Sequence, residues 1–166
     1  MLIAVLSDSH SNYANIELAV DRLRGTGVEH VFHCGDIDDP RAVAMFEDFP
    51  TSFVFGNVDS DWNALNDAIE RSGNRCFGRL CQVELAGRKI AMLHGDDSRA
   101  LREAQQSGRH DFVFYGHTHV AEQRRVGPTL VVNPGALHRA RTKTLALIDL
   151  TTMNCEFVAV AQSPGR

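Results

Sequence analysis

The sequence has no apolar run that could cross a membrane, because no stretch approaches the roughly 20 apolar residues of a transmembrane helix. Its first apolar run, residues 2–6, is too short for the core of a signal peptide, and no positively charged stretch precedes it. The four cysteines are scattered and form no CxxC pair, which argues against both a zinc cluster and a disulfide framework. We therefore expect a cytoplasmic protein without a membrane partner.

An excess of positive charge is also missing, since 17 Lys and Arg oppose 21 Asp and Glu for a net charge of −4. This balance argues against a protein that holds nucleic acid by neutralising its phosphates. No GxGxxG, GxxxxGKS/T, GxSxG or HExxH motif is present, which excludes the common nucleotide cradles, serine nucleophiles and zinc-protease helices. The charge sum does not exclude a small electropositive pocket, because bound metal ions do not enter it.

The 166 residues suit one domain, which we expect to span residues 1–166, and 43% hydrophobic residues predict a packed core. Apolar and β-branched runs predict strands at residues 2–6, 31–33, 52–55, 89–93, 112–115, 121–126, 129–132, 144–150 and 156–160. Helical spacing predicts helices at residues 12–24, 41–48, 62–71 and 98–107. The alternation in the first half indicates parallel strands, and the strand-rich last third completes a mixed α/β sandwich.

Six of these predicted strands are each followed at once by a cluster of polar residues and glycines. The clusters are Asp8-Ser9-His10, Gly35-Asp36-Ile37-Asp38-Asp39, Gly56-Asn57-Val58-Asp59, His94-Gly95-Asp96-Asp97, Gly116-His117-Thr118-His119 and Asn133-Pro134-Gly135-Ala136. Ligands of open α/β sheets bind beyond the carboxyl ends of the strands, so we expect the clusters to converge on one rim. Asp, His and Asn without cysteine suit divalent cations of hard to borderline character. A single loop histidine is more often structural, but the repetition of this pattern favours a metal site.

The order of these motifs, DxH…GDxxD…GNxD…HG…GHTH…NPG from Asp8 to Ala136, resembles the calcineurin-like metallophosphoesterase superfamily, and most of all its small single-domain prokaryotic phosphodiesterase branch. The resemblance implies a four-layer αββα sandwich of two mixed β-sheets flanked by helices, with a two-metal site at the strand ends. It also implies the ligands of each metal: Asp8, His10 and His119 for one, Asn57, His94 and His117 for the other, and Asp36 bridging both.

The activity that this resemblance implies is hydrolysis of small phosphate esters, as a phosphodiesterase and also a phosphomonoesterase (phosphatase). In-line attack by a hydroxide that bridges the metals is expected, because a metal lowers the pKa of bound water from 15.7 to about 7 in favourable cases. Asp36, His94 and His117 would act catalytically through that hydroxide. Among divalent ions we expect Mn²⁺, while Fe²⁺, Ni²⁺, Co²⁺ and Zn²⁺ also suit the ligands.

The sequence departs from the family pattern at three positions. Val58 stands where many members have a histidine, Asp96 replaces the second histidine of an HGH motif, and Ala136 replaces the usual serine. No acid is therefore assigned to the leaving group, and we expect a preference for good leaving groups.

A non-catalytic scaffold, similar to the retromer subunit of the same superfamily, is the competing interpretation, and a regulatory metal-binding protein without turnover is a third. All seven ligand positions hold residues that can coordinate a metal, which favours the enzyme. A homo-oligomer is compatible with the sequence, which does not specify one.

Several residues near these motifs have a structural interpretation. We expect Asp39 to cap the helix after Pro40, Asp59 to orient a neighbouring loop or ligand, and Asn133 to support a turn. For His33, a contact to a ligand carboxylate competes with a role as a core histidine bonded to backbone. Arg139, Arg141 and Lys143 would share one face if extended and could then steer an anionic substrate, or would belong to a solvated loop. These alternatives stay open at the level of sequence.

Overall fold

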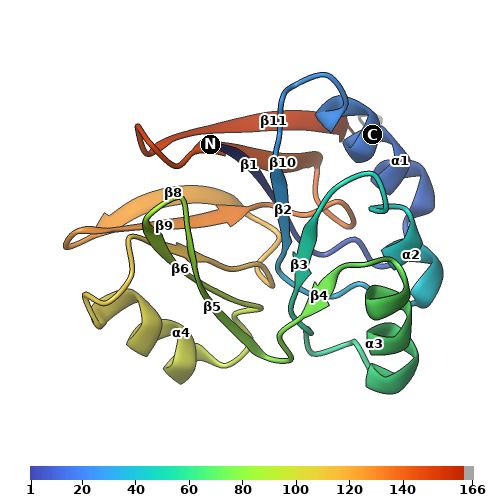
Figure 1. The fold of residues 1–166 in the computed structure, drawn as a ribbon, viewed down its shortest axis with the longest axis horizontal. Coiled ribbons are helices and arrows are strands. Elements are labelled where there is room, and N and C mark those ends of the chain that lie inside the picture. Colours follow the sequence, from blue (N-terminus) through green and yellow to red (C-terminus); the bar gives the residue numbers. More distant parts are fainter. Residues whose placement is uncertain (163–166) are drawn as a thin grey trace.

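The computed structural model describes residues 1–162; residues 163–166, which the predicted domain includes, lie outside them. Two mixed β-sheets face each other, with helices on the outer side of each (Figure 1). The first sheet has the order β11 (Asn154–Gln162), β10 (Thr142–Asp149), β1 (Leu2–Leu6), β2 (His30–His33), β3 (Thr51–Phe53) and β4 (Arg75–Cys76). The second has the order β5 (Leu80–Leu85), β6 (Arg88–Leu93), β7 (Phe112–Phe114), β9 (Thr129–Pro134) and β8 (Ala121–Val126).

The helices complete four layers, as predicted. The first sheet is covered by α1 (Tyr13–Leu23), α2 (Pro40–Ala44) and α3 (Trp62–Arg71), whose apolar side chains pack with those of β1 and β2. On the second sheet lies α4 (Ser98–Gln106), which packs through Ala104 against β6 and β7. The αββα sandwich is therefore confirmed. None of the helices within residues 1–162 is long and apolar enough to cross a membrane.

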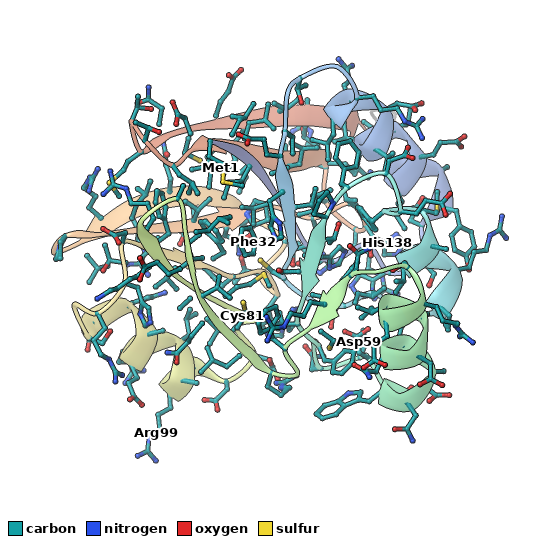
Figure 2. All side chains as sticks on the ribbon, in the orientation of Figure 1. Met1, Phe32, Asp59, Cys81, Arg99 and His138 are labelled. Atoms are coloured by element: carbon teal, nitrogen blue, oxygen red, sulfur yellow. The ribbon has the colours of Figure 1, made fainter. Side chains whose placement is uncertain are left out.

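The continuous apolar strands are buried on both faces. In β1, Ile3 and Val5 pack between the two sheets, while Ala4 and Leu6 pack against the helices. Phe32 also lies between the sheets (Figure 2). Because successive side chains of a strand point to opposite faces, a strand in the middle of a sandwich needs apolar residues at every position.

Strand direction brings the polar clusters to corresponding ends of the two sheets. In the first sheet β1, β2 and β3 run parallel to one another, and in the second β6, β7 and β9 do so. These are the six strands that the polar clusters follow. Each sheet therefore carries three of the clusters at the carboxyl ends of its parallel strands, which confirms the expected convergence within each sheet.

Some elements differ from the prediction. The edge strands β4 and β5 were not predicted, because β4 has only two residues and β5 mixes one fully buried side chain, Cys81, with exposed Gln82 and Glu84. The second helix ends at Ala44 rather than at residue 48, and the chain continues in turns. Its start is as expected, because Asp39 accepts the backbone N–H groups of Arg41 and Ala42.

Candidate metal centre

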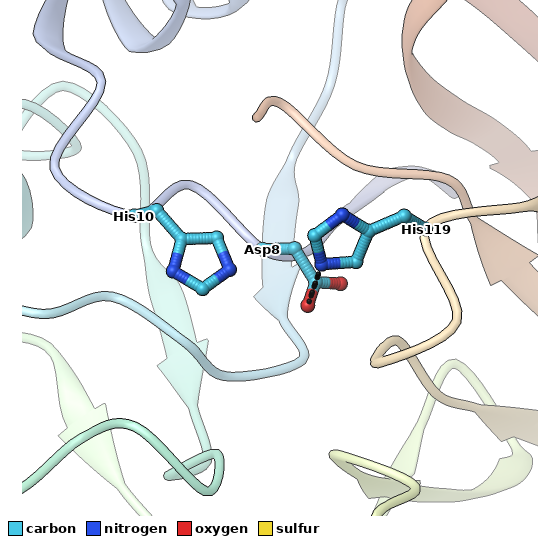
Figure 3. A group of neighbouring side chains, drawn as sticks. All are labelled: Asp8, His10 and His119. Atoms are coloured by element: carbon cyan, nitrogen blue, oxygen red, sulfur yellow. Dashed lines mark ion pairs between the residues drawn. The ribbon is translucent and has the colours of Figure 1, made fainter. Parts of the chain in front are cut away.

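The loop after β1 places Asp8 and His10 next to His119, which comes from the loop after β7 (Figure 3). Asp8 is fully buried, and its Oδ1 lies 3.2 Å from Nε2 of His119. The ring centroids of His10 and His119 are 5.5 Å apart. The backbone N–H of His117 donates to Oδ2 of Asp8 at 3.1 Å, so the two loops are held together. Residues more than 100 positions apart thus surround one point.

Asp36 lies in the loop after β2, between two histidines. Its Oδ2 is 3.5 Å from Nε2 of His10, and its Oδ1 is 3.3 Å from Nε2 of His94. The backbone N–H of Val58 donates to Oδ1 at 3.2 Å. Each carboxylate oxygen therefore faces a different imidazole, an orientation that suits a carboxylate shared between two cations.

Asp59 holds the backbone around Asp36. Its Oδ2 accepts the N–H groups of Asp36 at 2.9 Å and Gly56 at 2.7 Å, and its Oδ1 accepts those of Ile37 at 2.8 Å and Asp38 at 2.9 Å. The side chain is buried, so these four bonds satisfy a charge that water does not reach. The predicted role of Asp59 in orienting a neighbouring loop is confirmed.

His94 directly follows β6 and is buried with a defined tautomer. Its Nδ1 lies 2.8 Å from the carbonyl oxygen of Cys34, and because a carbonyl can only accept, Nδ1 carries the proton. In the neutral ring Nε2 then carries a lone pair and can only accept. It nevertheless faces two other acceptors, the Oδ1 atoms of Asn57 at 3.1 Å and Asp36 at 3.3 Å. A cation between these three acceptors would satisfy all of them, and a backbone carbonyl behind the histidine is a common support for a metal ligand.

His117 and Asn57 are the exposed members of the predicted ligand set, whereas the other five ligands are buried or half-buried. The ring of His117 packs edge-on against His94 with centroids 5.1 Å apart. Its contact with His94 puts it on the side of the site where Asn57 also lies.

Two groups of three side chains can each hold an ion within the described residues. One consists of Asp8, His10 and His119, and the other of Asp8, Asp36 and His94, with ligand atoms within 4.8 Å of one another. Oδ1 of Asp8 and Nε2 of His10 are buried and make no hydrogen bond of acceptable geometry among residues 1–162, although His119 and Asp36 lie within 3.5 Å of them. Buried polar atoms are rarely left unpaired, so these two atoms fit a site built for a cation.

The electrostatics of the site are those of carboxylates and imidazoles held close together. Burial raises the pKa of Asp8, which its histidine neighbours offset only in part. Burial lowers the pKa of His94, but the hydrogen bond and charge of Asp36 outweigh it and raise that pKa above its ordinary value. Burial raises the pKa of Asp36, but the hydrogen bond and charge of His94 outweigh it and leave that pKa below its ordinary value. Asp8, whose pKa burial raises, is the residue shared by both three-residue groups.

The backbone of the site loops is strained. Five predicted ligands have a positive φ, between 44° and 67°: Asp8, His10, Asp36, His117 and His119. Residues other than glycine seldom adopt this region, and such strain persists where the surrounding structure enforces it, often at functional sites. The loops therefore position these side chains at a cost in backbone energy.

The departures from the family pattern have defined surroundings. Val58 is exposed beside Asp36, to which its backbone N–H donates. Asp96 forms an ion pair with Arg79, whose Nη1 also donates to the carbonyl of Phe55 at 3.1 Å. Burial raises the pKa of Asp96, but Arg79 outweighs it and leaves the pKa below its ordinary value. A carboxylate held ionised in this way is a poor proton donor.

His33 turns out to be a core histidine. The N–H of Gly35 donates to its Nδ1 at 3.3 Å, so Nε2 carries the proton toward the hydroxyl of Ser9 at 3.0 Å. Burial lowers the pKa of His33 to about 3. Of the two interpretations, the backbone-bonded core histidine is confirmed, and the contact to a ligand carboxylate is wrong.

Asn133 supports the loop that carries His117 and His119. It is fully buried, donates to the carbonyl of Gly116 at 2.8 Å, and accepts the N–H of Gly135 at 3.0 Å. The supporting turn is therefore confirmed. Arg139 lies in a bend before β10 with a φ of 53°, so the extended segment with a shared cationic face is wrong for this residue.

Sequence reasoning missed two neighbours of His10. Oδ2 of Asp38 lies 3.5 Å from its Nδ1, and the ring of His138 lies 5.4 Å from its ring, centroid to centroid. Asp38 stands in one of the six polar clusters without an assigned role, and His138 lies outside all six. The signal that could have found His138 is its place three residues after the NPG turn, on a loop of the same rim.

Comparisons with known proteins identify the class. Residues 1–153 match the calcineurin-like phosphoesterase superfamily domain, so the chain belongs to this family, whose members depend on divalent metals. Phosphodiesterase MJ0936 of Methanocaldococcus jannaschii is 31% identical over 138 residues, covering 81% of this chain and 83% of that protein. The solved structure of an archaeal phosphodiesterase matches with a TM-score of 0.90 at 27% identity, covering 96% of this chain and 99% of that one.

A third comparison concerns the scaffold alternative. Vps29 of Entamoeba histolytica, solved in complex with Zn²⁺, matches with a TM-score of 0.68 at 18% identity and covers 97% of this chain and 100% of that one. At this identity the likeness shows a shared fold. The phosphodiesterase relatives place the chain among phosphoesterase hydrolases.

Proposed function

We propose that this protein hydrolyses small phosphate diesters, and also monoesters, with a centre of two divalent metal ions. Asp8, His10 and His119 would hold one ion. Asn57, His94 and His117 would hold the other, and Asp36 would bridge the two. The side chains that act in catalysis through this centre are Asp36, His94 and His117.

The observation that carries the proposal is the orientation of Asp36. Its two carboxylate oxygens face His10 on one side and His94 on the other, at 3.5 and 3.3 Å. Asp59 fixes the backbone of this residue, because its carboxylate accepts the N–H of Asp36 at 2.9 Å and the N–H of the next residue, Ile37, at 2.8 Å. A rigid carboxylate between two imidazoles supports a shared ligand better than a surface ion pair would.

The charge of the ligand set suits an anionic substrate. Bound divalent ions would supply positive charge and an activated water at neutral pH. Against their combined charge of +4, Asp8 and Asp36 contribute only −2, since the remaining ligands are neutral imidazoles and one amide. The surplus would attract a phosphate ester to the rim.

Mn²⁺ is the ion that we propose for activity, because oxygen and imidazole ligands without thiolate suit it. The four cysteines are free, and two of them, Cys34 and Cys81, are buried, which supports a reducing cytoplasm as the location. The intact ligand set argues against a non-catalytic scaffold. Buried carboxylates and imidazoles that bind no cation would only destabilise such a protein.

The test combines metal analysis with hydrolysis of aryl monoesters, aryl diesters and alkyl diesters. We expect about two equivalents of metal and turnover in the wild type, with aryl diesters favoured. Asp36→Ala should lower the metal content at both positions and abolish turnover, because both sites share this carboxylate. His94→Ala should chiefly empty one position.

His30→Ala is the matched control, because His30 starts the same strand that leads to Asp36 and contacts Ser52 at the opposite end. It should leave metal content and turnover near the wild-type values. A metal-replete wild type that hydrolyses none of the esters would overturn the proposal.

A further inference from the structure

His138 lies beside the candidate metal centre without belonging to either group of three ligands (labelled in Figure 2). Its ring centroid is 5.4 Å from that of His10, and His10 is in turn 5.5 Å from His119. His10 therefore contacts both rings, and His138 lies one ring contact away from the proposed metal position. His138 is partly exposed, so a bound molecule can reach it.

The start of α1 determines which nitrogen of His138 carries the proton. Asn12 is the N-cap of this helix, and its Oδ1 accepts the backbone N–H of Asn15 at 3.2 Å. This turns the Nδ2 amide group toward Nδ1 of His138, at 3.3 Å. An amide nitrogen can only donate, so Nδ1 must accept, and in the neutral ring the proton sits on Nε2.

The backbone beside His138 is anchored to the same part of the fold. The N–H of Leu137 donates to the carbonyl of Ser7 at 3.2 Å, and the carbonyl of Leu137 accepts from Nδ2 of Asn15 at 2.7 Å. Leu137 itself is fully buried. Hence the loop after β9 is hydrogen-bonded to the loop after β1 and to α1, which places His138 next to the loop that carries Asp8 and His10.

We propose that Nε2–H of His138 donates a hydrogen bond to a non-bridging phosphoryl oxygen of the bound phosphate ester, with Asn12 as the positioning residue that fixes the tautomer. The side chain makes no second hydrogen bond within residues 1–162, so this donor is available to a ligand. A neutral imidazole N–H is too weak an acid to give its proton to a leaving group, but it is a good donor to a charged oxygen. The inference rests on the proposed function and assigns a substrate contact of that same site.

The first experiment replaces His138 by Phe, which keeps a ring without nitrogen, and by Gln, whose amide nitrogen comes close to the place of Nε2. Binding of inorganic phosphate to the Mn²⁺-loaded protein, measured by calorimetry, should weaken by about 10- to 100-fold for His138→Phe and recover in large part for His138→Gln. Metal content should stay at the wild-type level in both. Phosphate binding that is unchanged in His138→Phe would overturn the inference.

A second experiment addresses Asn12. Asn12→Ser keeps an N-cap oxygen for α1 but removes the amide N–H groups that face Nδ1 of His138. The ¹⁵N chemical shifts of the His138 ring, measured on the metal-free protein above its titration, should show a proton on Nε2 in the wild type and a mixture of tautomers in the variant. A proton on Nδ1 in the wild type would contradict the assignment, whatever the enzyme does.

Kinetics then identify the oxygen that His138 contacts. A contact to a non-bridging oxygen predicts that His138→Phe lowers kcat/KM by a similar factor for good and poor leaving groups. A factor that grows as the leaving group worsens would instead place the contact on the leaving oxygen and overturn the assignment. If the wild type hydrolyses no ester, the proposed function fails. The phosphate-binding and ¹⁵N measurements still test whether His138 donates to a phosphoryl oxygen from Nε2.

Discussion

Single residues that touch no substrate set much of the geometry of the centre, and Asp59 is the strongest case. Its carboxylate accepts four backbone N–H groups, three of them from consecutive residues that begin with Asp36. A carboxylate suits this position because it is the only side chain with two oxygens that both only accept. The side chain of Asp59 thus holds the loop in a conformation that includes a positive φ at Asp36.

Asp59→Asn tests this role. One acceptor oxygen becomes an NH₂ group that faces backbone donors, so we expect a loss of about 3 kcal/mol in the free energy of unfolding, measured by urea denaturation. Mn²⁺ affinity should fall as well. Asp61→Asn is the control, because Asp61 caps α3 through Ala64 and asparagine is an equally good cap. Equal stability of the two variants would contradict the role of Asp59.

His33 makes a separate prediction about pH. Its pKa is about 3 in the folded protein because of burial, against 6.5 in the unfolded chain. Between these values the unfolded chain binds a proton that the folded protein does not, so the free energy of unfolding falls as the pH falls below 6.5. From pH 7.5 to 5 the metal-free wild type should lose about 2 kcal/mol more than His33→Gln, by urea denaturation. Parallel pH profiles would show that His33 is not the cause.

At the scale of elements, the ends of neighbouring strands are packed so closely that side chains at certain positions are excluded. Gly56, at the end of β3, lies against Asp36 from the end of β2, and a Cβ there would come within 1.9 Å of Oδ1 of Asp36. Gly116, after β7, lies against Ser7 in the same way, and a Cβ at Gly116 would come within 1.8 Å of Oγ of Ser7. The first approach joins two loops of one sheet, and the second joins a loop of each sheet, so both bring site loops together.

Gly56→Ala should therefore displace the carboxylate of Asp36 and not merely fill space. We expect Mn²⁺ affinity to fall by at least about 10-fold, measured by calorimetry, with the far-ultraviolet circular dichroism retained. Gly127→Asn in the β8–β9 turn, where nothing lies within 4 Å, should keep wild-type affinity. Unchanged affinity in Gly56→Ala would mean that Asp36 does not need its observed position.

For the whole molecule, the proposed centre links the two sheets. Asp8 and Asp36 follow strands of the first sheet, whereas His94 and His119 follow strands of the second. An ion bound by both sets would hold the sandwich together at one edge, and its binding energy would add to the free energy of unfolding.

Mn²⁺ at about 100 times its Kd should stabilise the protein by about 2.7 kcal/mol and raise Tm by roughly 5–10 °C at pH 7.5. EDTA should reverse the shift, and Asp36→Ala should lack most of it. The shift should vanish below about pH 6, because protonated imidazoles do not bind metal. A thermal scan by calorimetry measures each of these. A shift that persists at pH 5 would contradict ligation through histidine.

Much of the centre could be predicted from sequence, because continuous apolar strands followed at once by Asp, His and Asn are a local pattern. The mixed α/β sandwich and the loops that carry Asp8, Asp36 and His94 were predicted in this way, and the family resemblance implied the four αββα layers. The edge strand β5 was not, because its side chains alternate between exposed and more buried positions and form no continuous apolar run.

The sequence by itself determined which residues can bind a metal and on which strand ends they lie, since strand periodicity and residue chemistry are local properties. Only the tertiary structure decided how they meet. It places the oxygens of Asp36 between two histidines, puts His33 in the core, and brings His138 to the centre through Asn12. These contacts join positions up to 126 residues apart, and their geometry depends on how the two sheets and their loops pack, which no local pattern contains.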